Sequence, residues 1–255
     1  MISKGTRFNK KIIPVLIVLI VLIPSLSFED HSFVGERLVF DLSWYGISGG
    51  TSVLEVEKAV YKNHMVYKTT STTRSNQFIS LIYPVHDVIE SYIDIKSLYP
   101  YRYRARQSEG SFRSDKEIIF NRESNSASYV NHRSAGKQKT SEISQGTHDP
   151  LSVVYYFRTL PIEIGKDIYI DVFDGKKNWS ILVQVLKKEQ VWTPAGTFNT
   201  IKVKPQMKFE GLFVNKGDVY IWFTDDNLRI PVKMESKIKI GNITAMLLEK
   251  RLPAP

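Results

Sequence analysis

The feature that most constrains the fold is a series of short segments in which apolar and polar residues alternate, separated by residues that favour tight turns. Alternation with a period of two is typical of β-strands, because successive side chains point to opposite faces. Asp174-Gly175 and Gly241-Asn242 suit two-residue hairpin turns, and residues 193–196 suit a type I turn. Strands joined by such short turns lie side by side. The second half of the chain therefore predicts strands at 166–173, 178–186, 188–193, 197–206, 208–214, 218–224, 231–240 and 243–251.

The first half carries the same signal. Segments 36–45, 53–58 and 65–73 alternate or are rich in β-branched residues, and we expect Gly49-Gly50 and Lys62-Asn63 to separate them. The predicted fold class is mainly β. It is an antiparallel meander that forms a curved sheet, or an open or closed β-barrel-like domain, with one or two short helices.

Two segments interrupt the strand pattern. Residues 149–158 predict a helix, because Asp149 suits the N-cap, Pro150 suits the first turn, and apolar residues follow at helical spacing. Residues 76–83 predict a second, weaker helix ahead of Pro84. A long sheet must have one face covered, so we expect both helices to act as plugs on it.

The first 27 residues are typical of a secretory signal peptide. Four basic residues precede an apolar run from Ile12 to Ile23, and small residues at Ser25 and Ser27 suit cleavage ahead of Phe28. The run is shorter than the roughly 20 residues of a spanning helix. We expect a periplasmic mature protein; an uncleaved inner-membrane anchor is the alternative.

The mature part is expected to be a single β-rich domain at 28–255. A second reading has two β-meander halves, 33–145 and 160–252, joined by the short helix at 149–158. Within the first half, residues 121–146 are poor in apolar side chains and are expected to be the least ordered stretch.

Composition excludes several classes of function. The chain has no cysteine, so disulfides, thiolate metal sites and thiol nucleophiles are ruled out. The net charge is +9, and removal of the signal peptide leaves +5. This balance suits anionic envelope partners such as lipid headgroups or acidic glycans, although a solvated basic surface explains it as well. We expect no nucleic-acid partner, because the chain is exported and no binding module is recognised.

Four signatures occur in order along the chain. They are Gly35-Glu36 with Leu38 and Phe40; His148-Asp149-Pro150 with Ser152 and Arg158; the sequence Thr-Pro-Ala-Gly-Thr-Phe at 193–198; and Trp-Phe-Thr-Asp-Asp at 222–226 with Arg229, Pro231 and Val232. Together they resemble the bacterial exported family known as domain of unknown function 3108 (DUF3108), over about residues 33–252. The resemblance implies an envelope-located, mostly antiparallel β protein without an established enzymatic role. At the level of fold it is also similar to lipoprotein carriers, whose open curved sheet wraps helices around an apolar cavity.

No catalytic or metal site is expected. His148, Asp149 and Ser152 lie close in sequence, but no nucleophile-elbow motif accompanies them, and a helix cap explains Asp149 and Ser152. The five histidines are far apart, so they do not form a metal-binding motif. Asp225 and Asp226 are better explained by a turn than by a calcium site.

The segment 99–106 is the most informative candidate site. In an extended strand, Tyr99, Tyr101 and Tyr103 share one face, and Arg102, Arg104 and Arg106 share the other. An ordinary strand with an aromatic core side and a basic solvent side accounts for the pattern. The alternative is a platform whose aromatic face lines an apolar cavity or stacks on sugars, while the arginines bind phosphates or carboxylates. The candidate ligand-binding residues are Tyr99, Tyr101, Tyr103, Arg102, Arg104, Phe78, Ile82 and Trp222.

Two functions are therefore expected as alternatives. The first is a non-catalytic exported envelope protein that binds an apolar or amphiphilic ligand such as a lipid, without a cofactor. The second is an interaction or assembly factor for envelope proteins or polysaccharide. A deep apolar cavity favours the first, and a filled core with a charged face favours the second.

Overall fold

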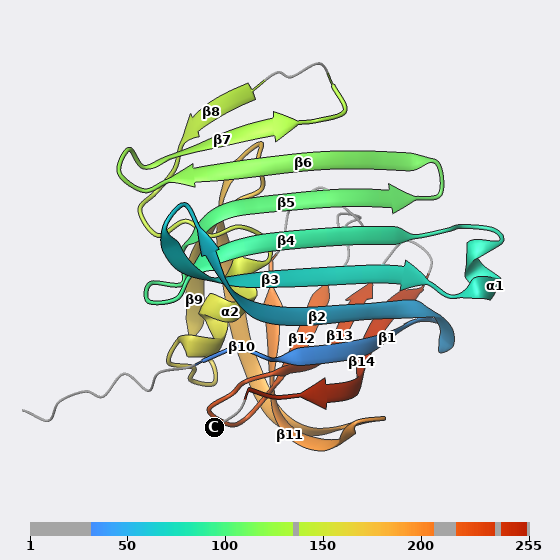
Figure 1. Ribbon diagram of the computed structural model, residues 1–255. Coiled ribbons are helices and arrows are strands. Elements are labelled where there is room, and N and C mark those ends of the chain that lie inside the picture. Colours follow the sequence, from blue (N-terminus) through green and yellow to red (C-terminus); the bar gives the residue numbers. More distant parts are fainter. Residues whose placement is uncertain (1–31, 135–137, 207–217, 238–240, 254–255) are drawn as a thin grey trace, which may run out of the picture. The chain divides into compact units, whose positions relative to one another are not determined.

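The computed structural model describes residues 32–134, 138–206, 218–237 and 241–253. The predicted signal peptide, its cleavage site and the predicted strand at 208–214 lie outside these residues. The strands and helices belong to one compact unit, His31–Pro255. The elements, drawn in Figure 1, are β1 (Arg37–Trp44), β2 (Ile47–Tyr61), β3 (His64–Ser75), α1 (Gln77–Ser80), β4 (His86–Asp94), β5 (Pro100–Glu109), β6 (Phe112–Asn121), β7 (Ser126–Asn131), β8 (Gln138–Glu142), α2 (Ser152–Thr159), β9 (Asp167–Phe173), β10 (Asn178–Thr193), β11 (Gly196–Pro205), β12 (Val219–Thr224), β13 (Pro231–Lys237) and β14 (Asn242–Arg251).

The described strands form one antiparallel sheet of 14 strands. Its order is β8-β7-β6-β5-β4-β3-β2-β1-β14-β13-β12-β11-β10-β9, so each half of the chain is a meander and the halves join where β1 pairs with β14. Among the described residues β8 and β9 do not pair, and the sheet is therefore open. The mainly β, antiparallel class predicted from the sequence is confirmed.

Tight turns fix the register of the first strands. Lys62 and Asn63 have φ angles of 47° and 66°, as expected for the turn between β2 and β3. The break predicted at Gly49-Gly50 is wrong, because the chain turns earlier, at Tyr45 and Gly46, where φ is 51° and 78°. Gly50 lies inside β2, and a Cβ there would meet the carbonyl oxygen of Arg74 on β3 at 2.2 Å. A close approach between backbones, and not a turn, requires this glycine.

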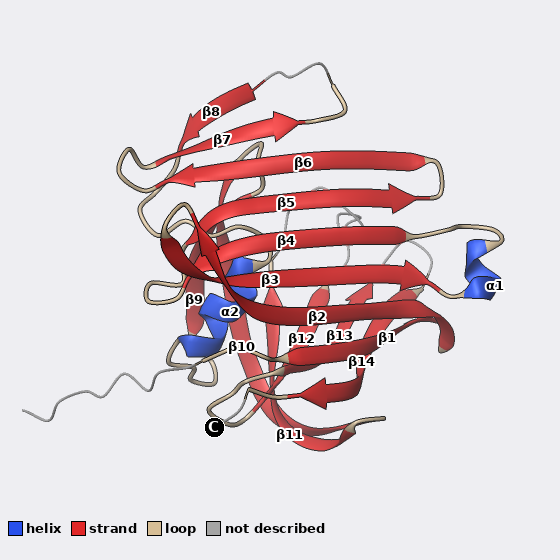
Figure 2. Ribbon diagram, in the orientation of Figure 1, coloured by secondary structure: helices blue, strands red, loops and turns tan. Residues whose placement is uncertain are grey.

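The helix α2 fills the space between the two halves of the sheet (Figure 2). Its Tyr155 packs in a cluster with residues of β2–β7 and β9, and its Phe157 packs in a second cluster with residues of β9–β12. A third cluster, with buried residues from β1, β10 and β12–β14, includes Leu38 and Leu247. The predicted plug at 149–158 is therefore found one turn later, at Ser152–Thr159. No helix in the described part of the chain is long and apolar enough to cross a bilayer.

Two expectations about the first half are wrong. The helix α1 has only four residues, none of them buried, and it lies at one end of the sheet, where it does not cover a face (Figure 2). The described residues of the stretch 121–146 include the strands β7 and β8, because β7 pairs with β6 and β8 pairs with β7 although both strands have few apolar side chains.

Candidate functional site

The strand β5 does not present its tyrosines as one face. The pairing of β4 with β5 shifts between Tyr92 and Ile93, which leaves Tyr101 without a direct partner in the register. A bulge of this kind redirects the side chains that precede it. Tyr103 is buried in the core, whereas Tyr101 is half-buried and stacks on His64 at a ring distance of 4.8 Å.

The hydroxyl of Tyr101 donates to the Asp94 carboxylate at 3.0 Å. Burial and this bond raise the pKa of Tyr101, while the bonds that Asp94 accepts lower its pKa despite partial burial. Tyr99 precedes the strand, and its ring contacts His148 and Tyr156. The three tyrosines thus lie in three different environments.

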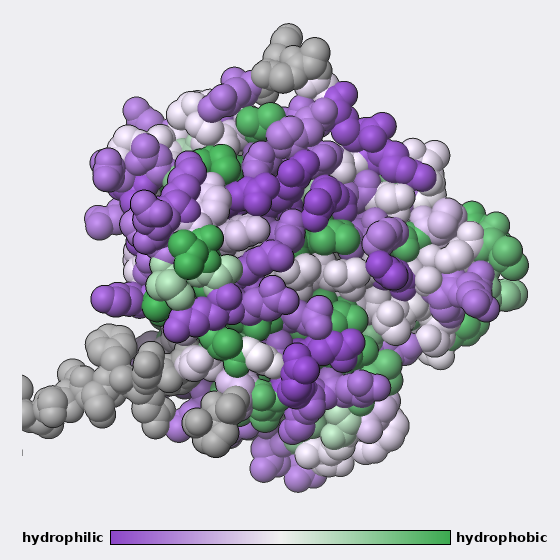
Figure 3. Space-filling model, in the orientation of Figure 1, coloured by the Kyte–Doolittle hydropathy of each residue, from purple (hydrophilic) through white to green (hydrophobic). Residues whose placement is uncertain are grey.

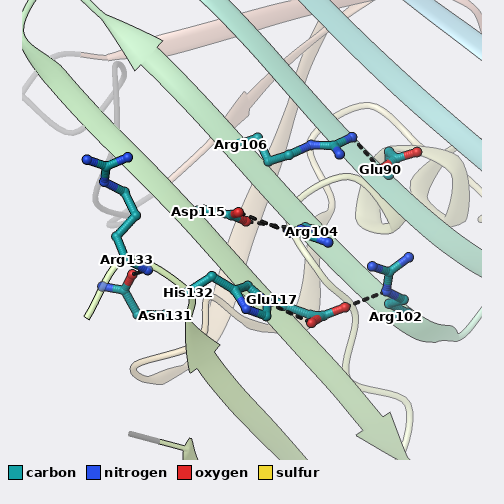
Figure 4. A network of polar contacts seen from close by, with 9 residues as sticks. All are labelled: Glu90, Arg102, Arg104, Arg106, Asp115, Glu117, Asn131, His132 and Arg133. Carbon is teal, nitrogen blue, oxygen red and sulfur yellow. Dashed lines mark hydrogen bonds and ion pairs between the residues drawn. The ribbon is translucent and has the colours of Figure 1, made fainter. Parts of the chain in front are cut away.

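The arginines of β5 are ion-paired along the other face of the sheet (Figure 4). Arg102 Nε donates to Glu117 at 2.6 Å, Arg104 makes two bonds of 3.0 Å to Asp115, and Arg106 Nη2 donates to Glu90 at 2.8 Å. These carboxylates come from the neighbouring strands β6 and β4. The pairs neutralise the cationic face that the sequence predicted.

Trp222 lies in the third core cluster. Its indole nitrogen donates to Glu189 at 2.8 Å, and the ammonium groups of Lys202 and Lys233 lie 4.5 Å and 4.7 Å from the ring. Both lysines are its direct cross-strand neighbours. The contacts hold the indole in place from both sides, in a manner typical of cation–π packing.

The residues His148, Asp149 and Ser152 form the entry to α2. Asp149 Oδ1 accepts from the backbone nitrogens of Leu151 and Ser152, and Asp149 Oδ2 accepts from Ser91 on β4 at 2.5 Å. Ser152 Oγ accepts from the backbone nitrogen of Asp149 and lies 3.5 Å from His148 Nδ1. Burial lowers the pKa of His148 to about 3, so the ring is neutral. This geometry is that of a buried helix cap.

Phe78 and Ile82 lie at the opposite end of the sheet, in the largest group of exposed apolar side chains. Leu81 and Ile82 are 84% and 79% exposed. The turns β1–β2, β3–β4 and β5–β6 meet at this end, because turns in a meander alternate between the two ends. We call the group the apolar end. Its members are Trp44, Tyr45, Ile47, Phe78, Leu81, Ile82, Tyr83 and Phe112, eight of the fifteen large apolar side chains that are exposed among the described residues.

Polar bonds hold the apolar end together. Asn76 caps α1 through its side chain and also donates from Nδ2 to the carbonyl of Ser48, next to Ile47. The ring of Tyr83 lies against Gly110, which precedes Phe112 by two residues. Figure 3 shows apolar atoms gathered at this end, over α1. Hydrogen bonds therefore stabilise the turns that carry these exposed apolar side chains.

The charges around the apolar end are unequal. Arg74 and Arg113 are exposed there, and neither makes an ion pair with a described carboxylate; Arg113 donates to the carbonyls of Gly110 and Phe112. The nearby carboxyls of Asp87 and Glu109 are buried. Burial, together with a hydrogen bond to Asp87, raises the pKa of Glu109 to about 7. This end therefore presents apolar and cationic groups to solvent, beside the half-buried carboxylate of Asp41, which accepts from Ser48 Oγ.

Sequence reasoning identified Phe78 and Ile82 but not their neighbours Tyr45, Ile47 and Phe112. All three are apolar residues at turns, where polar residues are usual, and this position was the available signal. Which turns share an end depends on the strand order. The structure does not bring the eight predicted ligand-binding residues into one site.

A family model described as a protein of unknown function (DUF3108) matches residues 39–248, as the sequence resemblance suggested. The sequence matches none of the curated proteins with which it was compared. A β-barrel-like protein of domain of unknown function DUF1849 from Brucella abortus has a similar structure, with a TM-score of 0.55, 12% identity, and coverage of 87% of this chain and 99% of that one. A protein from Bacteroides fragilis with a YmcC-like fold gives a TM-score of 0.40 and 16% identity, and covers 86% of this chain and 96% of that one. The first likeness supports the fold alone.

Proposed function

The chain belongs to the DUF3108 family, and from this premise we propose that it is a non-catalytic protein of the cell envelope that docks on an anionic lipid surface through its apolar end. The periplasmic location rests on the signal-like residues 1–27, with an uncleaved inner-membrane anchor as the alternative. The observation that carries the proposal is the gathering of eight exposed apolar side chains at one end of the sheet. Three of them are Trp or Tyr, and a fourth, Phe112, is a phenylalanine beside a turn.

The chemistry of this end suits the boundary between headgroups and acyl chains. Trp and Tyr favour that boundary because their rings have an apolar body and a polar tip. Apolar surface that enters a bilayer gains about 25 cal/mol per Å². Arg74 and Arg113 match the negative charge of anionic lipids, and the nearby carboxyls of Asp87 and Glu109 are turned away from solvent.

The filled interior favours a surface site over an enclosed one. Three clusters of buried side chains and α2 occupy the space inside the described sheet. Two hollows at the surface have volumes of about 180 Å³ and 450 Å³. The smaller one is well below the roughly 300–1,000 Å³ of pockets that hold drug-sized ligands and is too small for a lipid, and the larger one is open and lined by several charged groups. We therefore place the lipid at the apolar end and not inside the sheet.

Vesicle co-sedimentation tests the proposal. The exported protein is mixed with vesicles of phosphatidylethanolamine and phosphatidylglycerol, or of phosphatidylcholine alone. We expect binding to the anionic vesicles that weakens as salt is added. The triple variant Phe78→Ser, Leu81→Ser, Ile82→Ser should bind about tenfold more weakly or worse, because each large apolar side chain contributes about 1.5–3 kcal/mol when fully buried.

A control variant replaces three exposed apolar side chains that lie on other parts of the sheet. The variant Val60→Ser, Tyr169→Ser, Trp192→Ser changes three side chains that are each about two-thirds exposed and lie outside the apolar end. It should bind vesicles like the wild type. Equal binding by the two triple variants, or no binding by the wild type, contradicts docking through the apolar end.

A further inference from the structure

A second feature lies at the other end of the sheet, between the β4–β5 turn and the β6–β7 turn. A hollow of about 180 Å³ opens there. Its lining includes Ser97, Tyr99, Asn121, Arg122, Asn125 and Ser144. Since the turns of a meander alternate between ends, this hollow is separate from the apolar end, and lipid docking does not use it.

Arg122 is the unusual residue of the hollow. Its guanidinium lies between two aromatic rings, 5.1 Å from the ring of Tyr99 and 4.8 Å from that of Tyr101. Its Nη2 donates to Ser97 Oγ at 2.6 Å and to the carbonyl of Tyr99 at 3.1 Å. Its Nε is buried and has no hydrogen-bond partner.

The charge of Arg122 is not neutralised by a described carboxylate. Asp94, which shares the partner Ser97 with Arg122, accepts from the hydroxyls of Ser97 and Tyr101, so both of its oxygens are already engaged. The arginines of β5, in contrast, all have carboxylate partners. A half-buried guanidinium with neutral partners is stabilised by an oxyanion, because charge-assisted bonds to carboxylate or phosphate are about twice as strong as neutral ones.

The rest of the lining is mixed, as a sugar ring requires. Asn125 and Ser144 offer an amide and a hydroxyl, which can both donate and accept hydrogen bonds, while Phe120 and Ile143 provide an apolar wall. An apolar cavity of about 150 Å³ holds a benzene ring in a well-studied case, so the volume here suits one six-membered ring. We propose that this hollow binds a single acidic sugar residue, with its carboxylate or phosphate on Arg122.

Isothermal titration of the exported protein tests this assignment with four probes: glucuronate, glucose 6-phosphate, glucose and inorganic phosphate. We expect at least one of the two acidic sugars to bind, glucose not to bind, and inorganic phosphate to bind more weakly than the acidic sugar. Arg122→Gln should weaken the acidic sugar about tenfold or more, since it removes a charged partner. Arg74→Gln, an exposed arginine at the apolar end, is the matched control and should bind sugars like the wild type.

A second variant separates binding from folding, because Arg122 also bonds to Ser97 and Tyr99. Ser144 is exposed and lines the hollow, so Ser144→Trp should block it while thermal unfolding stays as in the wild type. Loss of sugar binding in both variants, with vesicle binding unchanged, supports the proposal. Absence of binding by both acidic sugars, equal affinity for inorganic phosphate, or wild-type affinity in Ser144→Trp overturns it.

Discussion

At the scale of single residues, three buried carboxyl groups have different partners, and the partners affect how readily each group holds a proton. Glu36 faces Arg158 across a buried ion pair. Glu109 faces a second carboxyl group, that of Asp87, and burial with this bond raises its pKa to about 7. Asp149 is buried too, and burial raises its pKa to about 6 although four hydrogen bonds oppose the shift. Burial and the acidic neighbour of Glu109 together place its pKa near neutrality.

Glu109 should make stability depend on pH between about 4.5 and 7. An acid whose pKa is raised on folding keeps its proton in the folded state at a pH where the unfolded chain loses it. The stability that the protonated Glu109 contributes is therefore fully present below pH 4.5 and is lost as the pH rises through 7. The free energy of unfolding, measured in urea at pH 5, 6, 7 and 8, should fall across this range relative to that of Glu109→Gln. A difference between the two proteins that does not change with pH would contradict the assignment.

At the scale of elements, α2 is anchored to the sheet at its first turn. Asp149 joins the backbone of Leu151 and Ser152 to the hydroxyl of Ser91 on β4, and it is fully buried. One carboxylate therefore ends the loop, caps the helix and fixes the helix against a strand 58 residues earlier in the chain. The helix α1 is capped by Asn76, whose side chain also bonds to the carbonyl of Ser48 on β2, but none of the four helix residues is buried.

Asp149→Ala should lower the free energy of unfolding by about 1–3 kcal/mol, because it leaves buried donors without an acceptor. Asp149→Asn keeps Oδ1 for the two backbone donors, and its amide can donate to the Ser91 oxygen, so it should cost less. Urea unfolding of both variants at pH 7.5 measures the two losses. A loss in Asp149→Asn as large as that in Asp149→Ala would show that the charge, and not the hydrogen bonds, stabilises the helix.

At the scale of the whole molecule, the pair of Glu36 and Arg158 connects three distant parts of the chain. Arg158 makes bonds of 2.8 Å and 2.6 Å to the carboxylate of Glu36, just ahead of β1, and its Nε donates to the carbonyl of Leu228, between β12 and β13. The guanidinium also lies over the rings of Phe33 and Tyr155. The end of α2 is thereby bonded to both meanders, to the first through Glu36 and to the second through Leu228.

Removing one member of this pair should cost more than removing both. Arg158→Met leaves an unpaired buried carboxylate and should lower the free energy of unfolding by about 3–5 kcal/mol, and Glu36→Leu should behave similarly. The double variant should lose less than either single variant, and so less than the sum of the two single losses, since neither charge is left alone. Guanidinium unfolding of the wild type, the two single variants and the double variant gives the four free energies of this double-mutant cycle. Additive losses would mean that the two groups do not depend on each other.

The local elements of this protein could be predicted from the sequence because their signals are local. Alternation identified most strands, Lys62-Asn63 identified a turn, and Asp149 identified the turn that leads into α2, which begins at Ser152. The same reasoning identified Phe78 and Ile82 as candidate site residues, because the cluster of apolar residues ahead of Pro84 is visible in the sequence itself.

Contacts between distant residues were decided only by the tertiary structure. Gly50 lies inside a strand because the backbone of β3 passes close to it, and the bulge opposite Tyr92 moves Tyr101 away from Tyr103. Arg122 comes from a segment that is poor in apolar residues, yet strand pairing places it beside Tyr99 and Tyr101. The sequence period determines which residues form strands and which side of a strand each one occupies. The partner strand, its register and the end at which each turn lies depend on pairing across the whole sheet, which no local pattern encodes.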